Sequence, residues 1–367
     1  MNRVELNYGM LLVVLALLGL GMVMVYSSSA VFALETYGDS LFFTKRQSMF
    51  LVMGLCAMTV GLAIPSRFFY HNAYWLLALA VGLLVLVMVP GLGHRAGGAT
   101  RWLSLGFFKL QVGEIVKVCL IAYLAMSLAK KADQMAVFRV GVVPHLMVLG
   151  VVATCLLQQP DFGTTVLLTL VTLTMLFCAG ARLRHIFGLF AAVIPLGIYF
   201  VVAAPYRMKR ITAFLDPWTH REGVGYQVVE SLLTFGSGQM TGLGLGDGRQ
   251  KLFFLPAAHT DFIFAVIGEE TGFVGTAAIL GLFFIFMMMG FQAVSRQHSR
   301  FERYLALGLT CVFAYQTLFN VFVVLGLLPT KGITLPFISY GGSSLILSCF
   351  MAGMLLRLAS RETPEET

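Results

Sequence analysis

Ten long apolar segments, separated by charged stretches, set the limits on how this chain can fold. Nearly all reach the roughly 20 residues that a helix needs to cross a hydrocarbon core. Hydrophobic residues occupy 58% of the 367 positions, charged residues occupy only 11%, and the mean hydropathy is +0.86, so a soluble globular domain is excluded. We expect an all-α polytopic membrane protein, one domain over residues 1–367, with ten transmembrane helices. The expected spans are 6–34, 47–66, 72–93, 112–129, 140–160, 162–181, 185–206, 262–295, 304–330 and 332–356.

The distribution of basic residues predicts the topology. The first apolar run, Tyr8 to Val25, is longer than the apolar core of a signal peptide, so we expect an uncleaved helix. An even number of spans puts both termini on one side, and the short loops of that side are rich in Lys and Arg. The positive-inside rule therefore predicts cytoplasmic termini. The opposite side also carries many cations, and this surplus indicates an external anionic ligand.

Two external loops are longer than the other connections, and the largest, residues 205–261, joins the seventh and eighth spans. A loop of this length is usually functional. Within it, Val224–Phe235 has the spacing of a short amphipathic helix. Residues 236–248 include six glycines, which we expect to form tight turns, although their backbone amides could also cradle phosphate. The other long loop, 93–111, joins the third and fourth spans.

Ionisable residues at bilayer depth need a partner or a function. Glu114 and Lys117 share one helix face, which fits either a local ion pair or a role of Lys117 in substrate binding. Asp161 lies in a tight Pro-Asp-Phe-Gly turn, where we expect it to cap the sixth span. The six cysteines show no CxxC spacing, no metal motif appears, no cofactor is required, and nothing indicates a nucleic-acid partner.

Asp261 is the candidate catalytic carboxylate. It stands where the external loop meets the eighth span, so it can be partly dehydrated and still reach a water-exposed substrate. Thr260 is expected to be the N-cap of this helix, with Asp261 in the first turn; Asp261 could then also have a purely structural role. Glu269 and Glu270 lie about 12 Å deeper at 1.5 Å per residue, and we expect them to hold helices together.

The motifs along the whole chain resemble those of the SEDS proteins (shape, elongation, division and sporulation), which include FtsW, RodA and SpoVE. The resemblance rests on Arg101-Trp102-Leu-Ser-Leu-Gly106, Gln111-x-x-Glu114-x-x-Lys117, Gln159-Pro160-Asp161, Gly225-Tyr226-Gln227, His259-Thr260-Asp261-Phe262, and the run from Leu328 to Ser344. The segment Pro329 to Thr334 is more similar to the FtsW and SpoVE branch than to RodA. Relatives often carry acids where this chain has Phe253 and Ala257, which lowers the local negative charge here.

The resemblance implies a peptidoglycan glycosyltransferase that polymerises lipid II with inversion and releases polyprenyl pyrophosphate. It makes the Asp261 position the catalytic carboxylate and the Lys109 and Lys117 positions important for activity. Arg101, Arg210 and Lys331 are further external cations that could neutralise the leaving pyrophosphate. A divalent cation could assist them.

The resemblance also implies a location in the bacterial cytoplasmic (inner) membrane. It further implies a partner, a class B penicillin-binding protein that acts as transpeptidase, within the division machinery. A lipid II flippase would need similar external cations and remains an alternative at this point. A secondary transporter is less favoured because the two halves show no convincing repeat.

Overall fold

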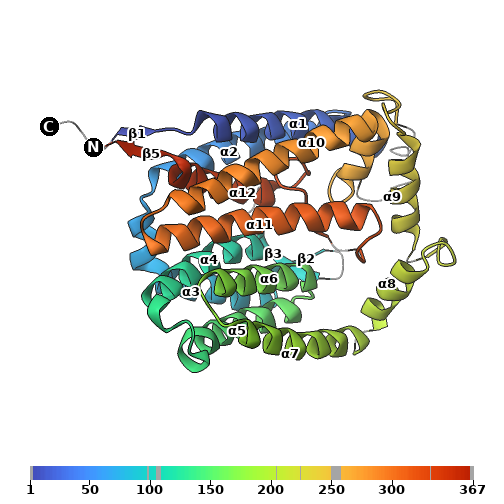
Figure 1. Cartoon of the computed structure of the whole chain (residues 1–367). Coiled ribbons are helices and arrows are strands. Elements are labelled where there is room, and N and C mark those ends of the chain that lie inside the picture. The colour runs from blue at the N-terminus through green and yellow to red at the C-terminus, as the bar shows by residue number, and fades with distance from the viewer. Residues whose placement is uncertain are drawn as a thin grey trace.

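The computed structural model describes residues 3–96, 99–104, 109–203, 205–223, 225–248, 258–330 and 332–363. Helices dominate this part of the chain (Figure 1). They are α1 Tyr8–Tyr37, α2 Phe42–Ala63, α3 Ser66–Met88, α4 Val112–Lys130, α5 Val143–Gln158, α6 Phe162–Cys178, α7 Leu183–Val202, α8 Pro205–Leu215, α9 Tyr226–Ser237, α10 Ile263–Arg296, α11 Arg300–Val324 and α12 Gly342–Ala359. The strands are β1 Arg3–Glu5, β2 Gly93–Ala96, β3 Ala99–Ser104, β4 Lys109–Gln111 and β5 Arg361–Thr363.

Each of the ten apolar segments corresponds mainly to one helix, in order α1 to α7 and α10 to α12. Eight helices within the described ranges are long and apolar enough to cross a membrane, counting α5 together with the turn that precedes it as Phe138–Gln158. Helix α6 is shorter, with 17 residues. The prediction of a polytopic helical membrane protein is therefore confirmed, whereas the exact number of ten spans stays a prediction.

The terminal strands β1 and β5 lie at one end of the bundle, and α8 and α9 lie at the opposite end (Figure 1). Strands β1 and β5 pair antiparallel, with Arg3 opposite Thr363. This arrangement agrees with an even number of crossings. Helix α4 lies in the interior and packs against α3 and α11, so that nearly its whole surface is buried.

The loop 93–111 contains strands that the all-α prediction missed. Strands β2, β3 and β4 form an antiparallel sheet in that order, and Trp102 pairs with both His94 and Gln111. The backbone N–H of Gln111 donates to Ser343 Oγ at 3.2 Å, which ties the sheet to the start of α12. This sheet carries Arg101 on β3 and Lys109 on β4.

Helix α10 is broken at Gly272, whose φ of 64° and ψ of −164° are not helical. Only glycine adopts this backbone conformation without strain. The external loop supplies the hydrogen bonds that the break removes. The N–H of Phe273 donates to the carbonyl of Gln239 at 2.9 Å, and the N–H of Val274 donates to that of Met240 at 3.1 Å. A short upper part, 263–271, is thus separated from a long lower part, 273–296.

The glycine-rich segment of the external loop packs directly on this break. The N–H of Leu243 donates to the carbonyl of Glu269 at 2.9 Å, and the N–H of Gly244 donates to that of Glu270 at 3.1 Å. Gly242 has a φ of +80°, and a Cβ there would lie 2.2 Å from the Glu270 carbonyl oxygen. These glycines serve turns and a close backbone approach, as the sequence indicates. The amides of Leu243 and Gly244 already have carbonyl partners.

Candidate active site

Asp261 lies in a turn just before α10, not in the first helical turn. The expected N-cap at Thr260 is wrong, because the helix begins at Ile263 and Phe262 occupies the cap position. The turn is shaped by a distant segment instead of a local cap. Ser339 Oγ donates to the carbonyl of Thr260 at 2.6 Å. The N–H of Tyr340 donates to that of His259 at 2.9 Å.

The segment 332–341 was expected to be the start of the last span, but it is not helical, and α12 begins only at Gly342. It packs against the Asp261 turn. A Cβ added to Gly332 would lie 3.1 Å from Asp261 Oδ2, so the carboxylate lies directly over this glycine. Asn320 Nδ2 donates to the carbonyl oxygens of both Asp261 and Ile333, each at 2.8 Å. The carboxylate therefore lies between two backbone segments that one side chain joins.

The environment of Asp261 favours a carboxylate that can exchange a proton near neutral pH. Its side chain is partly exposed but mostly surrounded by protein atoms. Burial raises its pKa from 3.8 to about 6, while the positive charges of Arg101 and Arg210 act in the opposite direction. Burial also lowers the pKa of the neighbouring His259 to about 4. His259 is thus neutral at pH 7, and its ring packs against Phe43 with centroids 4.5 Å apart.

Arg101 reaches from β3 to the turn that precedes α6. Its guanidinium donates to the carbonyls of Gln159, at 3.3 Å, and Pro160, and it lies 4.0 Å from Asp161 Oδ1. Asp161 in turn accepts from the N–H of Thr164 at 3.3 Å. The prediction that Asp161 caps α6 is confirmed, and its carboxylate also helps to hold Arg101.

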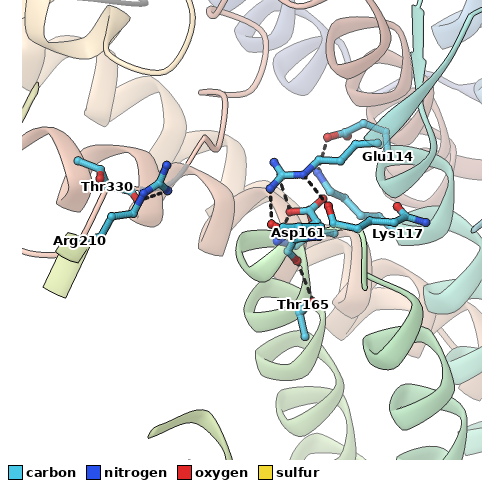
Figure 2. A network of polar contacts seen from close by, with 10 residues as sticks. Glu114, Lys117, Asp161, Thr165, Arg210 and Thr330 are labelled. Carbon is cyan, nitrogen blue, oxygen red and sulfur yellow. Dashed lines mark hydrogen bonds and ion pairs between the residues drawn. The ribbon is translucent and has the colours of Figure 1, made fainter. Parts of the chain in front are cut away.

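Arg210 approaches from the other side. It extends from α8, and its Nη1 donates to the carbonyl of Thr330 at 3.1 Å. In Figure 2, Arg210 and Thr330 lie on one side, and Asp161 lies with Glu114 and Lys117 on the other. The positive charges of Arg101, on β3, and Arg210, on α8, both act to lower the pKa of Asp261.

Lys117 is buried and paired, as the ion-pair interpretation predicts. Its Nζ lies 2.8 Å from Glu114 Oε1 and donates to Gln316 Oε1 at 3.1 Å. Lys117 and Glu114 are only 3% and 4% exposed, so Lys117 is enclosed instead of presented at the surface. Gln316 Nε2 donates onward to the carbonyl of Thr334 at 3.1 Å. This geometry connects Lys117 to the segment beneath Asp261.

The remaining predicted site residues are Lys109 and Lys331. Lys109 lies on β4 with an exposed side chain. Lys331, Phe253 and Ala257 lie outside the described residues. Glu269 and Glu270 are buried in the upper part of α10, and Ser27 Oγ donates to the Glu270 carboxylate at 2.5 and 2.7 Å. This contact with α1 agrees with the expected role of Glu270 in holding helices together.

Sequence reasoning missed Gln316 and Asn320. Both lie on α11, four residues apart, and both are 1% exposed. The available signal was a pair of amides at helical spacing inside an apolar segment, where a polar group needs a partner. Within the described ranges, no group of three or more His, Cys, Asp or Glu side chains could hold a metal ion.

Comparisons with known proteins agree with this architecture. The family model described as cell cycle protein, for FtsW, RodA and SpoVE, matches residues 8–364. A probable peptidoglycan glycosyltransferase FtsW of Trichlorobacter lovleyi is 44% identical over 97% of this chain and 93% of its own length. A protein of the same description from a Geobacter species is 42% identical, over 98% of this chain and 99% of the relative.

Solved structures agree as well. One comes from work on the structural coordination of polymerization and crosslinking by a peptidoglycan synthase complex. It superposes with a TM-score of 0.81 at 28% identity and covers 96% of this chain and 97% of its own. The rod shape determining protein RodA of Thermus thermophilus superposes with a TM-score of 0.71 at 26% identity, with 96% of each chain covered. The chain therefore belongs to the FtsW/RodA/SpoVE family of cell cycle proteins.

Proposed function

We propose that this protein is a peptidoglycan glycosyltransferase that polymerises lipid II at the external face of the cytoplasmic membrane. The observation that carries the proposal is the carboxylate of Asp261. It is partly buried at the start of a membrane helix, its pKa is raised to about 6, and it lies within the fields of Arg101 and Arg210. The names of the FtsW relatives support the same activity and do not favour the flippase alternative.

Asp261 acts in this proposal as the general base. The acceptor's 4-hydroxyl is a weak nucleophile that must lose its proton as it attacks, and a carboxylate with a pKa near the working pH is suited to take it. The new glycosidic C–O bond forms on the anomeric carbon of the donor. The bond from that carbon to the pyrophosphate oxygen breaks, and its electron pair leaves with the polyprenyl pyrophosphate. One displacement converts an α-linked donor into a β-linked glycan without a covalent enzyme intermediate.

The leaving pyrophosphate needs positive charge more than a proton. Among the described residues, Arg101 and Arg210 lower the pKa of Asp261 through their positive charge. We assign them to the pyrophosphate together with Lys109 and Lys331. Lys117 serves the same reaction from its buried ion pair, through Gln316 and the segment beneath Asp261. A divalent cation would be held chiefly by the pyrophosphate oxygens, because the described residues include no cluster of ligands for it.

The cellular setting follows from the same proposal. In this proposal both termini lie in the cytoplasm, and α8 and α9 face outward together with the strands β2 to β4. A class B penicillin-binding protein of the division machinery is the proposed partner that cross-links the product. The similarity to a chain from a complex that coordinates polymerization with crosslinking supports such a partner.

The test is polymerisation of purified lipid II by the full chain in proteoliposomes, with and without a co-reconstituted class B partner. We expect the wild-type protein to form glycan polymer and Asp261→Asn to form none. The matched control is Asp247→Asn, which changes an exposed carboxylate of the same external loop and should leave the rate unchanged. Normal polymerisation by Asp261→Asn would contradict the assignment of the base, and an inactive wild-type protein with its partner would contradict the proposed function.

A further inference from the structure

Two amide side chains on α11 hold the segment that supports the Asp261 carboxylate. Gln316 and Asn320 are four residues apart and therefore lie on one face of the helix. Gln316 donates to the carbonyl of Thr334, and Asn320 donates to that of Ile333. Neighbouring carbonyls of an irregular backbone segment are thus fixed by successive turns of one buried helix. We call Gln316 and Asn320 the amide row.

Asn320 has the more direct connection to the carboxylate. Both N–H groups of its Nδ2 are used, one by the Ile333 carbonyl and one by the Asp261 carbonyl. This double donation fixes the orientation of the amide, because the opposite orientation would place its oxygen against two carbonyl oxygens. The side chain thereby sets the spacing between the Asp261 turn and the segment that begins at Gly332.

That spacing determines where the carboxylate lies. Asp261 Oδ2 is 3.1 Å from the position of a Cβ on Gly332, so the carboxylate is in close contact with the segment that Asn320 fixes. A displacement of either backbone segment would move the carboxylate relative to a bound hydroxyl group. Misplacement of a reacting group by about 1 Å can reduce a rate on the order of 100-fold.

We infer that Asn320 is a positioning residue for the glycosyl transfer reaction. It aligns the Asp261 carboxylate by joining the 258–262 turn to the 332–334 segment, and Gln316 holds the next carbonyl of that segment. This inference rests on the proposed function of Asp261 as the base. Asn320 itself is buried and does not have to contact the substrate.

The first test is independent of activity. In nanodiscs, Asn320→Asp keeps the side-chain shape but replaces the double donor by oxygen acceptors, and Asn320→Gln keeps both N–H donors one methylene further out. We expect Asn320→Asp to speed amide hydrogen exchange in peptides that cover 258–262 and 332–341 together, with a smaller change for Asn320→Gln. The matched control is Ser231→Ala, which removes another buried side-chain bond to a backbone carbonyl, that of Val324 at 2.9 Å. It should leave both peptides unchanged.

The second test is the rate of polymerisation per inserted molecule. We expect Asn320→Asp to reduce kcat on the order of 10- to 100-fold with little change in KM, and Asn320→Gln to retain more activity. Unchanged exchange in both peptides, or faster exchange with an unchanged kcat, would overturn the inference. If Asn320→Asp fails to insert, the comparison of Asn320→Gln with wild type decides, since a fully normal kcat and exchange would also overturn it. An inactive wild-type protein would instead overturn the proposed function. The hydrogen-exchange measurement would still test whether Asn320 joins the 258–262 turn to the 332–334 segment.

Discussion

Replacement of Asp261 by asparagine should stabilise the folded protein at neutral pH while it abolishes polymerisation. The change removes a negative charge that the fold holds in a poorly hydrated position. The pKa of Asp261 rises from 3.8 to about 6, mainly through burial. At about 1.4 kcal/mol per pKa unit, the ionised carboxylate destabilises the folded state by about 3 kcal/mol. This value is an upper limit because the side chain keeps some contact with water.

The pH dependence gives this prediction a definite sign. Between pH 3.8 and about 6 the folded state binds a proton at Asp261 that the unfolded state has released. The stability of the wild-type protein therefore falls as the pH rises through this window. The gain in folding stability from Asp261→Asn should be complete above about pH 6 and should disappear below about pH 4. Thermal unfolding midpoints at several pH values between 4 and 7.5, measured in nanodiscs by tryptophan fluorescence, would show it.

The exposed Asp247 provides the matched control for this measurement. Asp247→Asn removes the same charge where water already solvates it, so its effect should stay within about 0.5 kcal/mol. A lower midpoint for Asp261→Asn at pH 7.5 would refute the reasoning. So would an advantage that is equal at pH 7.5 and pH 4, because the effect would then not come from the ionised carboxylate.

Three further predictions concern the same site. The polymerisation rate should be half-maximal near pH 6 and fall about tenfold per pH unit below it. Arg210→Gln should shift this acidic part of the pH profile to higher pH, because the positive charge that stabilises the ionised Asp261 is lost. Rates measured over a series of pH values test both predictions. Gly332→Ala should lower kcat at least about tenfold, since the new Cβ would displace the Asp261 carboxylate, while the unfolding midpoint stays nearly unchanged. Kinetics and thermal unfolding of the same variant test this, and an unchanged kcat would contradict it. Lys117→Met should lower the stability of the folded protein by about 3–5 kcal/mol, because it leaves Glu114 buried without its cation. Adding Glu114→Gln to the same chain should recover part of this stability. The yield of inserted protein measures both effects.

The long apolar segments predict the helices of this protein well, because a backbone in hydrocarbon must make its own hydrogen bonds and a single segment can do so only as a helix. Each of the ten predicted segments overlaps a helix, although the last begins with the non-helical segment 332–341. The amphipathic helix expected at 224–235 appears as α9, Tyr226–Ser237. Helix α9 packs against α10 and α11, and its Ser231 is buried there. Local chemistry also predicted the cap at Asp161, because a turn and its cap involve residues close in sequence.

The features that the sequence did not predict depend on contacts between distant segments. Threonine is a common N-cap residue, which is why Thr260 was expected to be one. Its turn is instead shaped by a hydrogen bond from Ser339, which is almost 80 residues away in the chain. The sheet β2–β3–β4 lies in a loop of mixed composition without clear alternation. The contact between Asn320 and Asp261 likewise joins residues far apart in the chain, and the amide row is recognisable only once α11 faces the Asp261 turn.

The break at Gly272 has a consequence for how the nascent chain enters the membrane. Residues 273–295 form an uninterrupted stretch without an ionisable side chain, about 35 Å long at 1.5 Å per residue, and so are sufficient to cross the hydrocarbon core without the part above them. The insertion machinery can partition this stretch into lipid without taking Glu269 and Glu270 through the bilayer centre, where each acid would oppose insertion. The turn that carries Asp261 can then be assembled afterwards from the outside, when the glycine-rich loop docks on the break.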